Sequence, residues 1–562
     1  MNNLIHLRSD RKKLGIIISV LIIIIGVIPL LILTYFPELK HSYTIEPLAL
    51  RSEDGVYISA YKYTPEIEKS HAGIVVCHGF FGNKLNMQPL SIELVKRGFT
   101  VLSFDFRGHG ASGGYFLRKD LIKDLKAAVD YFEYHLPYIT EIGLVGHSIG
   151  AEIASLFSRT NPNKVNVTVC IGSVSSNFSG VSNLLLVTGL YDPGVSEEKI
   201  IEVLQAYTGK ENVYVDETYW GDFTNGTNIR AYISPFSGHL SEVVDSAILY
   251  QIVQWFEQAF NGEKGENIFI TATILQIFSY VALFGVIFLN ATLIVYLSNY
   301  LFKNKFEFPE KEIFRGEVDY SIKKLIEYYA IPAVIIQIII FLILLDILGE
   351  IIPYSTISIT LSLIIGAAIG AFLIYIFILL SWEERFFFKH LSLRIKKMCS
   401  VHPGRSLIYG TLVALLVIFS IAAIWQWSVQ NTLPTVREVG TMIIITLISF
   451  PFFLIREFYF RSVQGRLKTS YKYEEYFIMV GIGIFMDNFV IISIIIIGRL
   501  NLAYLPAYAL YLFVWIIFSI IQNISVTWVY INSGRNILGS TIFLSILYSW
   551  MLVVFFPSYG FL

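Results

Sequence analysis

The sequence predicts two unlike parts, an α/β domain with a mostly parallel sheet and an all-α membrane domain, with about nine transmembrane helices in total. The 562 residues are 55% hydrophobic and 15% charged, with a mean hydropathy of +0.61. Soluble domains are about 45–50% apolar and about 25% charged. The apolar residues are also unevenly placed, because only residues 44–262 have the composition of a soluble domain. The net charge of -1 gives no support to nucleic-acid binding.

Residues 1–43 predict a cytoplasmic N-terminus and a signal-anchor helix. An apolar stretch at residues 14–36 follows a cluster of Lys and Arg. It is long enough for the roughly 20 residues that span a bilayer core, and longer than the core of a typical signal peptide. No cleavage pattern of small residues follows it. We therefore expect this helix to stay in the protein.

Residues 44–262 alternate short apolar stretches with helical patterns. The stretches typical of buried strands lie at residues 72–80, 100–106, 142–148, 165–173, 183–192 and 229–234. The helical patterns between them lie at residues 88–97, 118–135, 149–159 and 197–207. This alternation predicts a mostly parallel sheet with helices on both faces. Ligand sites in such sheets lie at the carboxyl ends of the strands.

A candidate nucleophile follows one of these strands. The segment GHSIG at 146–150 reads G-x-S-x-G between a predicted strand and a helical pattern, the context of a nucleophile elbow. The glycines permit a sharp turn that exposes the Ser148 hydroxyl. The backbone N–H groups of Phe80 and Ile149 are the candidate oxyanion hole.

The other members of a catalytic triad lie at later strand ends. Asp192 ends one predicted strand, and His239 lies just after the last one. The chain order Ser148, Asp192, His239 is that of α/β hydrolases. His239 would take the Ser148 proton, and Asp192 would orient the imidazole. The segment 213–228, a predicted hairpin, holds three alternative acids: Asp216, Glu217 and Asp222.

Five motifs carry a family resemblance. They are HGFFGNK (78–84), SFDFRGHGASGG (103–114), GHSIG (146–150), GLYD (189–192) and SGH (237–239). On these motifs residues 44–262 resemble the α/β-hydrolase domains of the serine aminopeptidase-like and dienelactone hydrolase-like groups. The resemblance implies an esterase, lipase or peptidase that needs no metal or organic cofactor. Two departures are the short connection at 174–182, which leaves no room for an inserted cap, and the long one between Asp192 and His239.

Other residues near these motifs have structural interpretations. We expect His78 and His147 to support the site rather than to react. Arg107 and His109 should shape a loop near it, and Arg107 could pair with Asp105. The three cysteines, Cys77, Cys170 and Cys399, predict buried or loop thiols and no disulfide framework. Three sequons place candidate glycosylation sites in the α/β domain, at Asn166, Asn177 and Asn225.

Residues 263–562 predict an eight-helix transmembrane domain. The apolar stretches lie near residues 268–300, 325–351, 355–381, 406–428, 439–460, 474–498, 503–531 and 537–556. If the N-terminus is cytoplasmic, the inside segments hold clusters of Lys and Arg, and the short outside loops hold only Arg437 and Arg499. This bias places the α/β domain and the C-terminus outside.

Ionisable residues within membrane spans are costly and are candidates for function. Asp487 lies near the middle of its span, whereas Asp346 and Glu350 lie near the end of theirs. Several intramembrane amides accompany them: Asn290, Gln337, Gln522 and Asn523. Hydrogen bonding between helices is our preferred interpretation of this set.

The sequence therefore predicts a membrane-embedded serine hydrolase with an extracytoplasmic active site. Its substrate would be a small-molecule or lipid ester, with an amide or peptide less favoured, and its surroundings would be membrane lipids. The alternative is a transporter or receptor whose hydrolase-like domain binds a ligand or a partner, because eight helices exceed what an anchor needs. The sequence predicts neither the substrate nor the oligomeric state.

Overall fold

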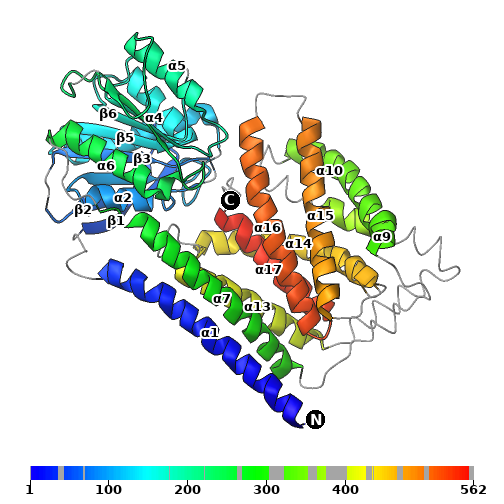
Figure 1. The fold of residues 1–562 in the computed structure, drawn as a ribbon. Coiled ribbons are helices and arrows are strands. Elements are labelled where there is room, and N and C mark those ends of the chain that lie inside the picture. Colours follow the sequence, from blue (N-terminus) through cyan, green and yellow to red (C-terminus); the bar gives the residue numbers. More distant parts are fainter. Residues whose placement is uncertain are drawn as a thin grey trace. The chain divides into compact units, whose positions relative to one another are not determined.

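A computed structural model gives the fold of the chain (Figure 1). The structure describes residues 2–35, 43–67, 70–80, 82–114, 116–175, 177–219, 222–262, 269–302, 322–351, 364–374, 402–425, 433–434, 436–464, 467, 472–498 and 505–555. The chain divides into two compact units. One holds residues 20–285, and with them the whole sheet, and the other holds most of the helical residues from 286 onward. Each unit is described by itself.

The sheet has nine strands in the order β1-β2-β4-β3-β5-β6-β7-β9-β8. Their bounds are β1 Tyr43–Arg51, β2 Tyr57–Pro65, β3 Ala72–Cys77, β4 Thr100–Phe104, β5 Glu141–His147, β6 Val167–Ile171, β7 Leu184–Gly189, β8 Thr218–Tyr219 and β9 Ile229–Ser234. The run β4-β3-β5-β6-β7-β9 is parallel, whereas β1, β2 and β8 pair antiparallel with their neighbours. The result is the mixed sheet of an α/β hydrolase.

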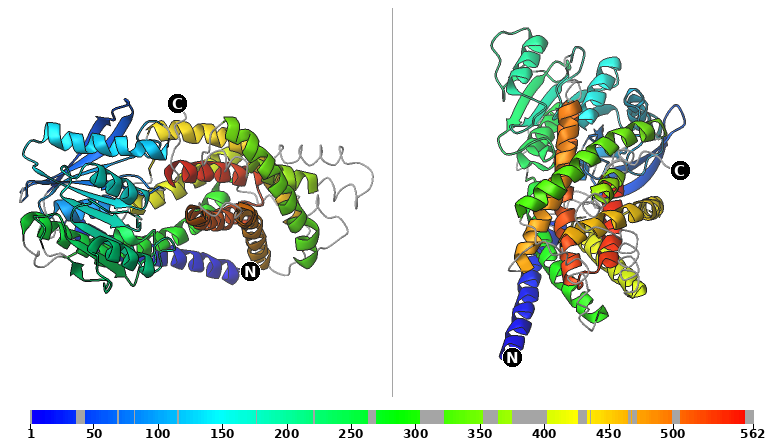
Figure 2. Two further views of the ribbon diagram at one scale, coloured as in Figure 1. Left: turned by 90° about the horizontal axis from the view of Figure 1, so that it is seen from above. Right: turned by 90° about the vertical axis from the view of Figure 1, so that its right-hand side faces the viewer.

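Helices cover both faces of this sheet (Figures 1 and 2). Their bounds are α2 Gln88–Val95, α3 Leu121–His135, α4 Ile149–Thr160, α5 Glu197–Thr208 and α6 Ser246–Asn261, with 3-10 turns η1 Arg118–Asp120 and η2 Glu242–Val244. Because side chains alternate along a strand, Ile74 and Val76 of β3 join the core under α2 and α6. Val75 and Cys77 join the opposite core, under α3 and α4.

The predicted strands and helices of this part of the chain are all present, within a few residues of their expected ends. Two elements were not predicted, the β1–β2 hairpin and α6. The parallel register brings the strand ends together, since Cys77 pairs with Gly146 and Gly189 pairs with Ser234. The segments that follow β3, β5, β7 and β9 therefore meet at one edge of the sheet.

Apart from the short α9, the remaining described helices are long and apolar. Their bounds are α1 Asn2–Tyr35, α7 Ala272–Leu301, α9 Ile322–Leu325, α10 Ile331–Ile351, α13 Pro403–Trp425, α14 Val436–Gln464, α15 Lys472–Gly498, α16 Leu505–Asn532 and α17 Ile537–Phe555, with a π turn η3 Ile326–Ala330. Five segments of the described residues are long and apolar enough to cross a membrane: Lys13–Leu33, Ala272–Leu301, Pro403–Trp425, Glu438–Arg461 and Ile537–Val554. The count of nine stays a prediction, and much of the span predicted at 355–381 lies outside the described residues.

Candidate active site

Ser148 lies on a strained turn between β5 and α4. Its φ of 55° is in the left-handed region, with ψ at -119°, where residues with a side chain are uncommon. A Cβ on Gly146 would come within 2.5 Å of the Ala151 nitrogen, and one on Gly150 would lie 2.6 Å from the carbonyl oxygens of Cys77 and His78. The two motif glycines are therefore needed because backbone passes close on both sides of Ser148.

His239 and Asp192 contact each other directly. His239 Nδ1 lies 2.8 Å from Asp192 Oδ2, and Asp192 Oδ1 accepts a hydrogen bond from the Gly194 N–H at 2.7 Å. Burial alone would raise the pKa of Asp192, but the hydrogen bond and charge of His239, together with the Gly194 N–H, hold it below its usual value. Asp192 is therefore a carboxylate fixed against the imidazole.

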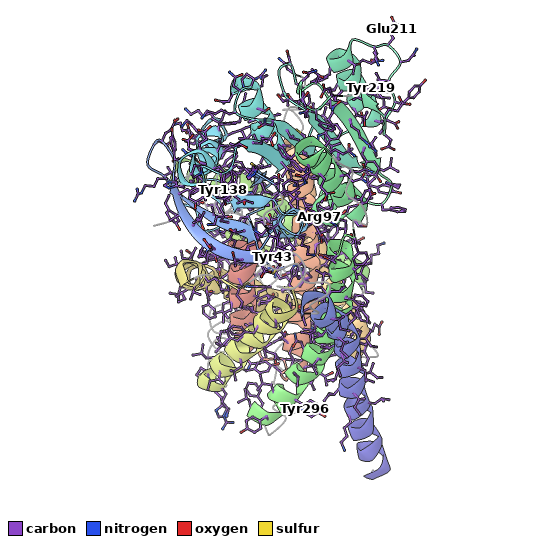
Figure 3. All side chains as sticks on the ribbon, turned by 90° about the vertical axis from the view of Figure 1, so that its left-hand side faces the viewer. Tyr43, Arg97, Tyr138, Glu211, Tyr219 and Tyr296 are labelled. Atoms are coloured by element: carbon purple, nitrogen blue, oxygen red, sulfur yellow. The ribbon has the colours of Figure 1, made fainter. Side chains whose placement is uncertain are left out.

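The alternative acids make other contacts. Glu217 accepts a hydrogen bond from the hydroxyl of Tyr219 at 3.1 Å, and Tyr219 is labelled in Figure 3 on the short edge strand β8. Asp222 accepts from the backbone and side chain of Thr224. Among the described residues of the predicted hairpin at 213–228 there is one strand, β8, and it pairs antiparallel with β9, which follows that segment. Among these acids Asp192 is the one that contacts His239.

His147 lies between the elbow and the His239 loop. Its Nε2 lies 2.8 Å from the carbonyl oxygen of His239, and the two imidazole rings are 4.8 Å apart. Burial lowers the pKa of His147 to about 4, so at neutral pH the ring is uncharged and its Nε2–H donates to that carbonyl. His147, which directly precedes Ser148, thus connects the nucleophile turn to the loop that carries His239.

The loop after β3 passes close to Ser148. A Cβ on Gly79 would lie 3.3 Å from Ser148 Cβ and 2.7 Å from His147 Nδ1. His78 Nε2 accepts a hydrogen bond from the Phe106 N–H at 3.0 Å, and His109 Nε2 lies 2.7 Å from the Phe80 carbonyl oxygen. Ile149 is the first residue of α4, where backbone N–H groups have no partner within the helix. Gly79, which precedes Phe80, is therefore close to the nucleophile, and the role of Phe80 and Ile149 as the oxyanion hole stays a prediction.

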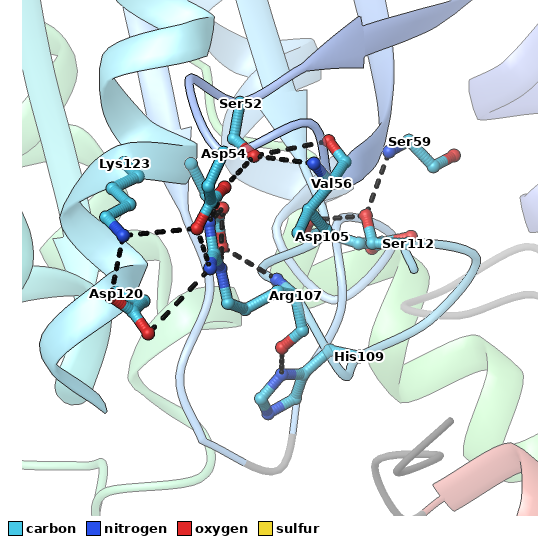
Figure 4. Close-up of polar contacts among 11 residues, drawn as sticks. Ser52, Asp54, Val56, Ser59, Asp105, Arg107, His109, Ser112, Asp120 and Lys123 are labelled. Atoms are coloured by element: carbon cyan, nitrogen blue, oxygen red, sulfur yellow. Dashed lines mark hydrogen bonds and ion pairs between the residues drawn. The ribbon is translucent and has the colours of Figure 1, made fainter. Parts of the chain in front are cut away.

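Arg107 holds the neighbouring loop in place (Figure 4). Its Nη2 lies 2.7 Å from Asp124 of α3, and its Nη1 lies 2.7 Å from Asp54 in the β1–β2 turn. The expected pair with Asp105 is not formed. Instead Asp105 pairs with Lys84 at 2.5 Å, and both residues are buried. Three ion pairs thus fix the loops beside the site, and the sequence named none of these three partnerships.

One buried carboxyl next to the site was not singled out from the sequence. Glu242 Oε2 lies 3.4 Å from His147 Nε2 and 3.9 Å from His239 Nδ1. The donor atoms of these three residues lie within 4.8 Å of one another, a grouping that could hold a metal ion. Here His239 Nδ1 contacts Asp192, and His147 Nε2 contacts a backbone carbonyl. The position of Glu242, three residues after His239, is the signal that could have revealed it.

Large apolar side chains are exposed on the loops that carry Asp192 and His239. Phe236 is 86% exposed and Tyr191 is 69% exposed, with Leu190 and Leu240 also exposed. Backbone hydrogen bonds join the two loops, from Leu190 N to Ser234 O and from Tyr191 N to Ser237 O. These four side chains, which we call the apolar rim, lie within three residues of Asp192 or His239.

Asp487, the intramembrane candidate, is paired within the helical unit. Its carboxylate lies 2.8 Å from Arg456 Nη2 of α14 and accepts from Asn523 Nδ2 of α16 at 2.7 Å. Asn290 donates to Ser420 at 2.7 Å, which joins α7 to α13. The side chains of Asp346 and Glu350 lie outside the described residues.

The Asp487 pair belongs to a longer buried network. Glu457 contacts both Arg456 and Arg461, at 3.2 and 2.8 Å. Gln464 links Arg461 to Glu475, which also accepts from Arg535 at 2.8 Å. In the described part of this network each arginine faces a carboxylate, so the charges balance.

The remaining predicted sites have ordinary environments. Cys77 and Cys170 are free and buried, whereas Cys399 lies outside the described residues. The three sequon asparagines are exposed, namely Asn166, Asn177 and Asn225. Glycosylation at these positions stays a prediction.

Comparison with known proteins identifies the type of the α/β domain. The family described as serine aminopeptidase, S33, matches residues 68–186. The WAV2 protein of Arabidopsis thaliana, an α/β hydrolase domain-containing protein, is 29% identical over 159 residues, which are 25% of this chain and 49% of that protein. A monoacylglycerol lipase of Mycolicibacterium smegmatis is 27% identical over 154 residues, which are 26% of this chain and 54% of the lipase.

Among solved structures, an esterase of Pyrococcus furiosus matches 40% of this chain and 96% of its own, with 19% identity and a TM-score of 0.31. The chain spans about half the length of the two curated relatives described above. The sheet topology is that of an α/β hydrolase fold. The family match makes residues 68–186 of this part similar to serine hydrolases.

Proposed function

We propose that this protein is a membrane-embedded serine hydrolase that cleaves an ester through an acyl-enzyme on Ser148. The observation that carries the proposal is the contact of His239 with Asp192 at the strand edge where Ser148 is held on a strained turn. An amide or peptide substrate is the less favoured variant of the same chemistry. The reaction needs no metal or organic cofactor.

The proposed acylation follows from the assignment of the two His239 nitrogens. Because Nδ1–H donates to Asp192, Nε2 is left to accept the proton of Ser148 Oγ. The oxygen attacks the substrate carbonyl carbon, and the carbonyl electrons move to its oxygen. When the tetrahedral intermediate collapses, the ester bond breaks and His239 Nε2 gives the proton to the leaving alcohol. Water then repeats these steps on the acyl-enzyme and releases the acid.

The negative oxygen formed in this step needs hydrogen-bond donors. We assign them to the backbone N–H groups of Phe80 and Ile149. Support comes from the close approach of Gly79 to Ser148 and from the place of Ile149 at the start of α4. A helix N-terminus also favours negative charge. Removal of one such donor in other hydrolases slows the reaction by about 100-fold or more.

The apolar rim supports a substrate with a long acyl chain, a lipid ester among the candidates. A short polar ester would be too small to cover these exposed apolar side chains. The test compares a soluble short-chain ester with a lipid ester in mixed micelles, using purified protein. A preference for the lipid ester supports the assignment, and turnover restricted to the soluble ester contradicts it.

We also place the protein in a membrane, with the hydrolase domain and the C-terminus outside and the N-terminus in the cytoplasm. Five apolar helices among the described residues and the Lys and Arg pattern of the loops support this placement. Protease accessibility of the hydrolase domain in intact cells tests the orientation. Protection in intact cells and cleavage only after lysis would reverse it.

A second candidate function is transport or ligand reception by the helical unit. The buried contact of Asp487 with Arg456 and Asn523 favours it, because intramembrane charges mark functional pathways by default. The balanced charges of the network favour a structural role instead. The hydrolase proposal is therefore the better supported of the two.

The proposed function is tested by ester hydrolysis. The full-length protein in detergent should hydrolyse p-nitrophenyl butyrate, and the Ser148→Ala variant should lose nearly all of this activity. Asp192→Asn should lower kcat strongly, because the His239 tautomer is then no longer fixed. Equal turnover by the wild type and Ser148→Ala would refute the assignment.

A further inference from the structure

The buried carboxyl of Glu242 has no part in the proposed acylation, although it lies beside the Asp192–His239 contact. It is the first residue of η2 and is fully buried. Burying a carboxyl costs free energy unless it is hydrogen-bonded or neutral. The burial of a carboxyl at this position therefore indicates a structural or chemical role for Glu242.

One oxygen of Glu242 is firmly bonded to the end of β7. Oε1 accepts from the Gly189 N–H at 2.7 Å and from the Thr188 hydroxyl at 2.9 Å. Gly189 is three residues before Asp192, and Glu242 is three residues after His239. The side chain therefore joins the segment that carries the acid to the segment that carries the base.

The other oxygen of Glu242 faces the catalytic groups. Oε2 is buried without a hydrogen-bond partner among the described residues. It lies 3.4 Å from His147 Nε2 and 3.9 Å from His239 Nδ1. At the end of β6, a Cβ on Gly172 would overlap this oxygen. The pocket for the carboxyl is thus closed by the ends of β5, β6 and β7.

The charges that face this pocket favour the neutral carboxyl. From β5 comes His147, which is uncharged at neutral pH, and from the segment after β7 comes Asp192, which is ionised. His239 is the titratable group on its own segment. Among the described residues no lysine or arginine pairs with Glu242. Burial first, and then the negative charge of Asp192, raise the pKa of Glu242 to about 8, although Gly189, His239 and Thr188 act in the opposite direction.

We propose that Glu242 is a positioning residue that holds the Asp192 and His239 segments in register while its own carboxyl is uncharged. The inference rests on the proposed hydrolase function. An uncharged Glu242 leaves Asp192 as the single negative charge that faces the imidazolium formed in the reaction.

The proposal predicts a loss of activity at alkaline pH. A carboxyl with a raised pKa keeps its proton below that pKa and loses it as the pH rises through it. Above about pH 8 two carboxylates would then share the pocket, repel each other and loosen the Asp192–His239 contact. For the wild type, kcat/KM should fall by about tenfold per pH unit beyond that point, if only the protonated form is active.

Glu242→Gln tests this most directly, because the amide is a neutral replacement of the same shape. Its oxygen can accept from Gly189 and Thr188, as Oε1 of the carboxyl does. We expect the full-length variant in detergent to remain active at neutral pH and to lose the alkaline decline. The exposed Glu202 of α5 provides the matched control, and Glu202→Gln should behave as the wild type.

Thr188→Val gives a second, independent measurement. It removes a donor that favours the ionised form of Glu242, so the alkaline decline should move to higher pH by up to about one unit. An alkaline decline unchanged in both variants overturns the proposal for Glu242, provided that Ser148 still reacts with a fluorophosphonate. If Ser148→Ala reacts as well as the wild type, the hydrolase function itself fails.

Discussion

Gly146 and Gly150 leave no room for side chains around Ser148. A Cβ on Gly146 would overlap the carbonyl group of Gly150, so the turn that exposes Ser148 depends on both positions. We predict that Gly146→Ala destabilises the domain by about 1–3 kcal/mol, as overpacking of a dense interior does. It should also lower ester turnover, because α4 must move away from β5.

The control for this prediction is Gly113→Ala. A Cβ on Gly113 would meet nothing nearer than Tyr57 O at 3.6 Å, which is an ordinary contact. Urea unfolding of both variants, followed by the tryptophan fluorescence of the α/β domain, gives the comparison. Equal stability of the two variants would contradict the close packing around Ser148.

The residues of the candidate site could be predicted only where they belong to a recognisable sequence motif. Ser148, Asp192 and His239 follow strand ends in the order typical of α/β hydrolases, so each could be named from the sequence. Glu242 lies in no such motif, and the motif that ends on Lys84 does not indicate the partner of this residue. The importance of both residues comes from contacts between segments far apart in the chain. Arg107 pairs with an acidic residue as expected, but the suggested partner Asp105 is only its neighbour in sequence, whereas the buried Asp124 is its neighbour in space.

At the scale of elements, Arg107 joins the loop after β4 to α3 and to the β1–β2 turn. Its guanidinium and the Asp124 carboxylate are both buried. We predict that Arg107→Ala destabilises the domain by about 3–5 kcal/mol, because it leaves the Asp124 charge without a partner. Arg118 is the control, since its pair with Glu152 is exposed and its loss should cost about 0–1 kcal/mol.

Chemical unfolding of the two arginine variants measures this difference. Arg107→Ala should also reduce ester turnover, because His109, which contacts the Phe80 carbonyl, follows Arg107 by two residues. If Arg107→Ala and Arg118→Ala had the same stability, the ion pairs of Arg107 would not hold these elements together.

Most elements with a strong pattern could be predicted, and the antiparallel hairpin β1–β2 could not. The helix α6 is an exception, because it was missed although one of its faces is buried in the core. The parallel strands are continuous apolar runs because both of their faces are buried. β1 is mostly exposed along its length, so its sequence lacks that pattern. The Asp54-Gly55 pair between β1 and β2 is the hairpin signal that could have revealed it.

At the scale of the whole molecule, the two units carry different candidate functions, and two variants separate them. If the protein acts as a hydrolase, Ser148→Ala should abolish its function in the native host. Asp487→Asn keeps the shape of the side chain and removes the charge that faces Arg456. If the network is structural, this variant should lower the thermal stability of the protein but leave the turnover of each folded molecule unchanged.

The opposite pattern would favour transport or reception. In that case Asp487→Asn would abolish function, whereas Ser148→Ala would leave it unchanged, as measured by complementation in the native host. Loss of function in both variants, with normal folding, would mean that the two units act together on one membrane substrate. The sequence could predict the apolar character of the helical unit but not the partners of Asp487, because the pairing of helices depends on contacts that composition does not encode.

Covalent labelling of Ser148 tests the central claim most directly. The full-length protein in detergent is treated with a fluorophosphonate, and the modified peptide is located by mass spectrometry. We predict a single adduct on Ser148, which is absent in Ser148→Ala and strongly slowed in His239→Gln. Labelling of Ser148→Ala to the same extent as the wild type, or no labelling of the wild type, would contradict the account.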